Sequence, residues 1–167
     1  MVKIQEKEDI MAVPLRASEV IQFAIRIEEN GEAFYRQMAE KIKTKDIKDL
    51  FNRLANEEVS HRDIFQHMVS KIEQYEPMET YPGEYFAYLR AYADGHVFTK
   101  EKKGQLMARK IKTAKEALEF AIRAEIDSIL YYMEAKNLVP EDQKGIIDKV
   151  IEEERRHYLK LVKIKEK

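Results

Sequence analysis

The sequence contains no cysteine and no tryptophan, and it has only 5 glycines and 4 prolines among 167 residues. Without cysteine there can be no disulfide scaffold, no zinc or iron–sulfur site built on thiolates, and no cysteine nucleophile. The scarcity of glycine and proline predicts long regular elements. A chain of this length can bury a core large enough to fold without crosslinks.

An excess of one charge is also missing, because 30 basic side chains are balanced by 31 acidic ones. This balance argues against a nucleic-acid partner. No apolar run approaches the ~18 residues of a transmembrane helix, so we expect no membrane partner. The first residues, Met1 to Ala12, lack the apolar stretch of a secretory signal, and we therefore predict a cytoplasmic protein.

Apolar residues recur at helical spacing in four long segments, and no segment alternates with the period of a strand. The fold class is therefore predicted to be all-α. We expect residues 1–16 to form a tail and 17–167 to form one helical bundle. The predicted helices span about 18–44, 46–75, 113–137 and 140 to nearly the C-terminus.

Local signals mark the ends of these helices. Ser18 is the expected cap of the first helix, and Thr113 with Glu116 forms a capping-box pattern at the start of the third. The long segment 76–112 contains two prolines and three glycines, and its aromatic-rich middle, 84–93, suits a short helix. We expect this segment to be a crossover between two helical hairpins, and its aromatic cluster to make a contact in a homodimer.

The first and third helices repeat each other at an offset of 97 residues. Six of fifteen aligned residues are identical when Ile21–Tyr35 is placed over Leu118–Tyr132. The second and fourth helices also align, at an offset of 96, with the motif Glu-Glu-x-x-His in both. The chain is therefore predicted to contain two copies of one helical hairpin.

Each helix has an apolar face that is interrupted at its middle by glutamate, or by glutamate and histidine. A carboxylate in a bundle core is costly unless it meets a cation, and no lysine or arginine lies on these faces. Two divalent metal ions would neutralise the carboxylates, and a Glu-x-x-His pair places both side chains on one face of a helix. Carboxylates with a few imidazoles favour iron or manganese. The predicted ligands are Glu28, Glu58, His61, Glu125, Glu154 and His157.

These motifs resemble those of the ferritin-like di-iron carboxylate proteins, in which two single glutamates and two Glu-x-x-His pairs line a four-helix bundle. The resemblance is closest to the rubrerythrins and erythrins and covers about 18–75 and 113–165. It implies a ferritin-like four-helix bundle that binds two iron ions, with manganese as the alternative metal. Two features differ: no cysteine is available for a rubredoxin domain, and Ser128 stands three residues after Glu125, where rubrerythrins carry a further carboxylate.

Other residues near the predicted ligands are assigned more ordinary roles. Glu29, Glu32, Glu57 and Glu153 are expected to point elsewhere, as solvated or supporting residues, and His67 and His96 to lie at the surface or in a loop. We expect Tyr35 and Tyr132 to support the site, each donating a hydrogen bond to a ligand glutamate of the opposite hairpin. The alternative is that both tyrosines are simple core residues.

Three functions fit this sequence. The favoured one is a redox enzyme that acts on peroxide or dioxygen at a di-iron site, with an external electron donor. The second is a ferroxidase that oxidises and stores iron within a larger shell, and the third is a metal-stabilised bundle without catalysis. A bundle with buried salt bridges in place of a metal is the structural alternative.

Overall fold

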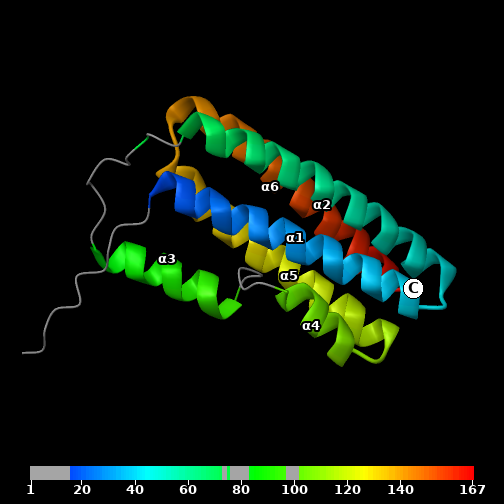
Figure 1. Ribbon diagram of the computed structural model, residues 1–167. Coiled ribbons are helices and arrows are strands. Elements are labelled where there is room, and N and C mark those ends of the chain that lie inside the picture. The colour runs from blue at the N-terminus through cyan, green and yellow to red at the C-terminus, as the bar shows by residue number, and fades with distance from the viewer. Residues whose placement is uncertain (1–15, 73–74, 76–82, 97–101) are drawn as a thin grey trace, which may run out of the picture.

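The computed structural model describes residues 16–72, 75, 83–96 and 102–167, and every regular element within them is a helix. Four long helices lie alongside one another as a bundle, with shorter helices on one side of it (Figure 1). The predicted all-α fold is therefore confirmed. The long helices are α1 (Ala17–Lys41), α2 (Lys45–Ile72), α5 (Ala114–Ala135) and α6 (Glu141–Lys165).

The two hairpins are formed by α1 with α2 and by α5 with α6, each joined by a short connection. The second connection includes a 3₁₀ turn, Lys136–Leu138. Of the predicted tail, 1–16, only Arg16 belongs to the described residues. Among the helices that the structure describes, none is both long enough and apolar enough to cross a membrane.

The helix starts show which local signals were interpreted correctly. The prediction that Ser18 caps α1 was wrong, because Arg16 is the capping residue and its backbone N–H donates to the Glu19 carboxylate at 2.9 Å. The acidic side chain satisfies that N–H, so the helix begins earlier than the serine indicates. The capping box of α5 is confirmed: Glu116 N–H donates to Thr113 Oγ1 at 3.1 Å, and Thr113 N–H donates to Glu116 Oε2 at 3.2 Å.

The bundle interior contains two apolar clusters, one near each end of the long helices. The predicted ligand residues lie at the middle of the helices, between these clusters. The flanking apolar side chains exclude water from both ends of the polar layer. Fully buried members of the clusters are Val20, Ile21, Phe65 and Ile147 on one side, and Phe51, Leu54 and Leu161 on the other.

The crossover contributes two helices, α3 (Gly83–His96) and α4 (Lys103–Lys110). The first agrees with the expected short helix, whereas α4 was not predicted, because Gly104 in its first turn is typical of a helix breaker. Here the glycine permits close packing instead. Its N–H donates to Asn30 Oδ1 at 2.9 Å, and a Cβ at this position would lie 2.0 Å from the Asn30 carbonyl oxygen. The crossover is thereby attached to α1, next to the polar layer.

Candidate metal centre

Six glutamate and histidine side chains meet in the interior of the bundle, and all are at least 95% buried. Each hairpin supplies one glutamate from its first helix and a Glu-x-x-His pair from its second. They form two overlapping groups, and within each group the candidate ligand atoms lie within 4.8 Å of one another. The groups are Glu28, Glu58, His61 and Glu154, and Glu58, Glu125, Glu154 and His157.

The two groups share Glu58 and Glu154, whose carboxylates extend toward both histidines. Glu154 Oε1 lies 2.7 Å from His61 Nδ1, and Glu154 Oε2 lies 3.2 Å from His157 Nδ1. Glu58 has the same relation at longer range, with Oε2 4.0 Å from His61 Nδ1 and Oε1 3.6 Å from His157 Nδ1. Each shared carboxylate thus presents one oxygen to each half of the cluster and would be able to hold a metal ion in either half.

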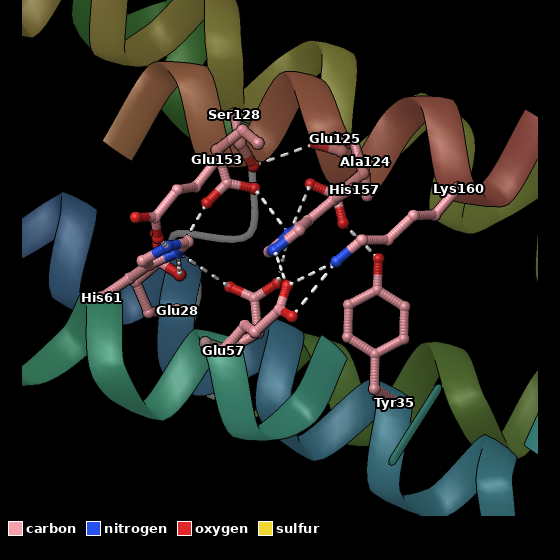
Figure 2. Close-up of polar contacts among 12 residues, drawn as sticks. Glu28, Tyr35, Glu57, His61, Ala124, Glu125, Ser128, Glu153, His157 and Lys160 are labelled. Atoms are coloured by element: carbon pink, nitrogen blue, oxygen red, sulfur yellow. Dashed lines mark hydrogen bonds and ion pairs between the residues drawn. The ribbon is translucent and has the colours of Figure 1, made fainter. Parts of the chain in front are cut away.

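The unshared glutamates each belong to one half. Glu28 Oε2 lies 3.5 Å from His61 Nδ1, and Glu125 Oε2 lies 3.7 Å from His157 Nδ1. The two imidazole rings are nearly parallel, with centroids 5.5 Å apart and an interplanar angle of 21°. Each ring directs Nδ1 into the cluster and Nε2 away from it, as Figure 2 shows.

The outward nitrogens of the histidines contact two further glutamates. His61 Nε2 lies 2.6 Å from Glu153 Oε2, and His157 Nε2 lies 2.5 Å from Glu57 Oε2. Each contact joins α2 to α6, so each glutamate supports the histidine of the opposite hairpin. The expectation that these glutamates point elsewhere was therefore wrong, whereas the supporting role that we also considered is what the structure shows. The signal in the sequence was the repetition of the whole Glu-Glu-x-x-His motif.

Lys160 was not identified from the sequence. Its Nζ lies 3.1 and 3.2 Å from the two carboxylate oxygens of Glu57, and it comes from the same helix as His157 (Figure 2). A lysine on a charged helix surface carries no recognisable sequence signal. Only the packing of α6 against α2 places it beside the carboxylate that supports His157.

Both tyrosines make the hydrogen bonds expected of them. The Tyr35 hydroxyl donates to Glu125 Oε1, and the Tyr132 hydroxyl donates to Glu28 Oε1. In each case the tyrosine of one hairpin orients the single glutamate of the other. The oxygen that remains on each glutamate, Oε2, is the one that faces the histidine.

Burial lowers the pKa values of both histidines, whereas contact with the carboxylates of the cluster raises them. Burial lowers the pKa of His61, but its close contacts with the carboxylates of Glu154 and Glu28 outweigh burial and raise that pKa to about 12. Burial also lowers the pKa of His157, and there the charges of Glu154 and Glu125 outweigh it and raise the pKa. Both imidazoles are therefore protonated on both nitrogens, and positively charged, when no metal ion competes for Nδ1.

The carboxylates divide into two classes. Burial, followed by the charge of Glu154, raises the pKa of Glu125 to about 8, and burial with the charges of Glu28 and Glu154 raises the pKa of Glu58. Burial also raises the pKa of Glu154, but the positive charge of His157 outweighs it, and the pKa lies well below its ordinary value. A metal ion that binds here must displace protons from several of these atoms.

The donor set fits divalent metal ions. Four inward-facing atoms, Glu28 Oε2, His61 Nδ1, Glu154 Oε1 and His157 Nδ1, lie close to other atoms of the cluster without a well-aligned hydrogen bond. The outward Nε2 of His157 also lacks a well-aligned hydrogen bond, although Glu57 Oε2 lies 2.5 Å away. Buried polar atoms without such a bond are costly. Among the described residues no lysine or arginine forms an ion pair with a member of the two groups, which disfavours the salt-bridge alternative. Carboxylate oxygens with imidazole nitrogens favour iron or manganese.

A small cavity lies on the side of the cluster formed by α1 and α5. Its volume is about 20 Å³, and the carboxylates of Glu58, Glu125 and Glu154 contribute to its wall. Gly31 and Ser128 also line it; the Ser128 hydroxyl donates to the Ala124 carbonyl at 2.9 Å. A space of this size holds one molecule of about the size of water.

The other acidic residues and the histidine singled out from the sequence, as far as the structure describes them, lie away from the cluster. Glu29 and His67 are exposed, and Glu32 forms ion pairs with Arg36 and Arg62 at 2.8 and 2.7 Å. These positions agree with the solvated or surface roles expected of them. The side chain of His96 lies outside the described residues.

Comparisons with known proteins agree with the helical bundle. The Rubrerythrin family model matches residues 19–165, a range that includes all four long helices except the first two residues of α1. No curated protein matches the chain. A crystal structure of a protein from Thermotoga maritima, assigned as a ferritin-like diiron-carboxylate protein, is similar with a TM-score of 0.67 and 31% identity, over 92% of this chain and 97% of that chain. The predicted ferritin-like bundle is thus confirmed.

Proposed function

The chain belongs to the rubrerythrin family of ferritin-like proteins, and on that premise we propose that it is a di-iron oxidoreductase that reduces peroxide or dioxygen. The observation that carries the proposal is the pair of overlapping Glu/His groups, joined by Glu58 and Glu154. Two groups with shared carboxylates are suited to two metal ions in one site. We assign one iron position to Glu28 and His61 and the other to Glu125 and His157.

The reaction class follows from the chemistry of such a pair. When bound, two ferrous ions supply the two electrons that convert hydrogen peroxide and two protons to water. The sequence has no cysteine for a thiolate-bound iron centre, and the proposal assigns the return of electrons to an external donor. Tyr35 and Tyr132 hold the single glutamates in place, and the contacts of Nε2 with Glu153 and Glu57 fix the orientation of both histidines.

The cavity beside the cluster supports a small oxidant as the substrate. It lies along Glu58, Glu125 and Glu154, away from the outward faces of the imidazoles, and its 20 Å³ suit peroxide or dioxygen. Gly31 contributes to this space, because a Cβ there would lie 3.2 Å from Glu58 Cδ. An organic hydroperoxide with a bulky substituent is too large for the cavity.

The first experiment measures iron content and the optical spectrum of protein prepared with iron and oxidised in air. We expect two iron ions per chain and the charge-transfer absorption of a ferric pair. One ion or none per chain would refute the two-metal assignment. Many iron ions per chain in an assembly of large mass would instead favour the ferroxidase and storage function.

The second experiment tests the reaction. The anaerobically reduced protein is mixed with hydrogen peroxide, dioxygen or tert-butyl hydroperoxide, and oxidation is followed optically. We expect rapid oxidation by peroxide or dioxygen and slow oxidation by the bulky hydroperoxide. Gly31→Ala should slow oxidation per bound iron ion, whereas Gly145→Ala, whose Cβ meets nothing within 4 Å, is the matched control. A reduced protein that stays reduced with all three oxidants would refute the redox function.

A further inference from the structure

The two halves of the cluster have nearly the same ligands but different surroundings. In each half the outward Nε2 of a histidine contacts a glutamate, at 2.6 Å for His61 with Glu153 and 2.5 Å for His157 with Glu57. Glu57 is also held by Lys160 at 3.1 Å. The internal repeat, with its offset of 96, places Ile64 at the position equivalent to Lys160.

The isoleucine cannot supply the missing positive charge. Ile64 is 37% exposed, and within the part of the chain that the structure describes no lysine or arginine forms an ion pair with Glu153. The duplication has therefore produced two histidine–glutamate pairs, of which only one is neutralised by a lysine. Figure 2 shows Lys160 beside Glu57, on the His157 side of the cluster.

This difference acts on the strength of the histidine ligands. A carboxylate that accepts the outer N–H of a ligating imidazole makes the inner nitrogen a better donor. An ammonium group on that carboxylate withdraws part of this effect, and it adds a positive charge that repels a metal cation. The side chains of Lys160 and Glu57 are 41% and 39% exposed, so water weakens the effect without removing it.

We propose that the cluster fills in a fixed order, with the position of Glu28 and His61 binding a divalent cation before the position of Glu125 and His157. Lys160 is the positioning residue that sets this order, through Glu57. The inference rests on the proposed two-metal site and adds that its two positions differ in affinity. The difference originates outside the ligand set, at one pair of residues related by the internal repeat.

A second effect of Lys160 on the His157 position acts in the opposite direction. Lys160 also restrains Glu57, and a restrained carboxylate orients its histidine better. If this orientation dominated, the His157 position would bind first and loss of the lysine would weaken it. The two effects therefore predict opposite changes for the same substitution.

The experiment adds Co²⁺ in steps to the metal-free protein and records the proton NMR signals of the ligated imidazoles, which the paramagnetic ion shifts strongly. His61→Ala and His157→Ala assign the signals. At one equivalent we expect the His61 signals to dominate by roughly tenfold, the lower end of effects seen for residues that support metal ligands. Equal intensities, or dominance of the His157 signals, would overturn the inference.

Exchanging the residues at the equivalent positions 64 and 160 of the two hairpins provides matched variants. Lys160→Ile should bring the two positions to similar affinity, and Lys160→Ile combined with Ile64→Lys should reverse the order. Lys160→Arg keeps the charge and should keep the wild-type order, which separates charge from a merely structural role. An order that is the same in all these variants would overturn the role of Lys160.

The possible failures are distinguishable. A protein that binds no Co²⁺, or only one ion, contradicts the two-metal site and with it the inference. A protein that binds two ions in no fixed order leaves the two-metal site intact and refutes only the inference. Helical content and the melting temperature of each metal-free variant identify any variant that has failed to fold. The variant with both Lys160→Ile and Ile64→Lys also keeps the amino-acid composition of the wild type.

Discussion

Raising the pH from 5 to 8 should destabilise the metal-free protein and stabilise the metal-loaded protein. The reason is the set of protons that the cluster holds when no metal is bound. Burial and the charge of Glu154 raise the pKa of Glu125 from 4.5 to about 8. The close contacts with the carboxylates of Glu154 and Glu28 overcome burial and raise the pKa of His61 from 6.5 to about 12.

The sign follows from linkage between proton binding and folding. A pKa that is raised on folding contributes stability that is complete below the unfolded value and is lost as the pH rises toward the folded value. For Glu125 this loss falls between pH 4.5 and about 8. For His61 it begins near 6.5 and adds to the loss. The pKa of Glu57 is lowered to about 2, and that of Glu154 is also lowered. These two groups change the stability only below pH 4.5, the ordinary pKa of a glutamate, which lies outside the interval tested.

The magnitude can be worked out for Glu125 alone. At ~1.4 kcal/mol per pH unit, the contribution lost between pH 5 and 8 is about 3 kcal/mol. For a chain of this size that corresponds to a decrease in melting temperature of roughly 6–12 °C. Bound metal reverses the trend, because protons compete for the ligand atoms and metal affinity rises with pH. The metal then stabilises the folded state by mass action.

The assay is thermal unfolding at pH 5, 6.5 and 8, with a chelator or with excess Mn²⁺, which avoids oxidation. Glu125→Gln is the control, since the amide keeps the shape of the side chain and cannot titrate. In the metal-free state this variant should depend less on pH than the wild type does. A metal-free protein that becomes more stable between pH 5 and 8, or a glutamine variant with the wild-type slope, would refute this reasoning.

Two further predictions concern the fold and the support of the ligands. Gly104→Ala should destabilise the protein, because the new Cβ would lie 2.0 Å from the Asn30 carbonyl oxygen. Gly145→Ala should be neutral or stabilise the protein by up to ~1 kcal/mol, since its Cβ meets nothing within 4 Å. Urea unfolding of both variants measures the difference. Tyr35→Phe and Tyr132→Phe should each lower the stability of the metal-free protein by about 1–3 kcal/mol through the loss of a hydrogen bond to a buried carboxylate, yet retain two metal ions. Loss of metal in either phenylalanine variant would show that the hydroxyl does more than orient its glutamate.

The sequence by itself determined the bundle and the residues at its centre. Helical periodicity places Glu58 and His61 on one face, one turn apart, and the repeat places Glu154 and His157 in the same relation. These are properties of a single helix, which sequence spacing specifies directly. The wide separation of the two hairpins along the chain also indicated a long crossover, 76–112.

Only the tertiary structure decided what surrounds the central residues. Glu57 and Glu153 contact histidines on the opposite hairpin, and Lys160 reaches Glu57 across the gap between α2 and α6. Such contacts depend on how two helices are rotated and offset against each other, and side-chain spacing within one helix does not encode this. The position of α4 was decided in the same way, because Gly104 matters through its close approach to Asn30 and not through its helix propensity.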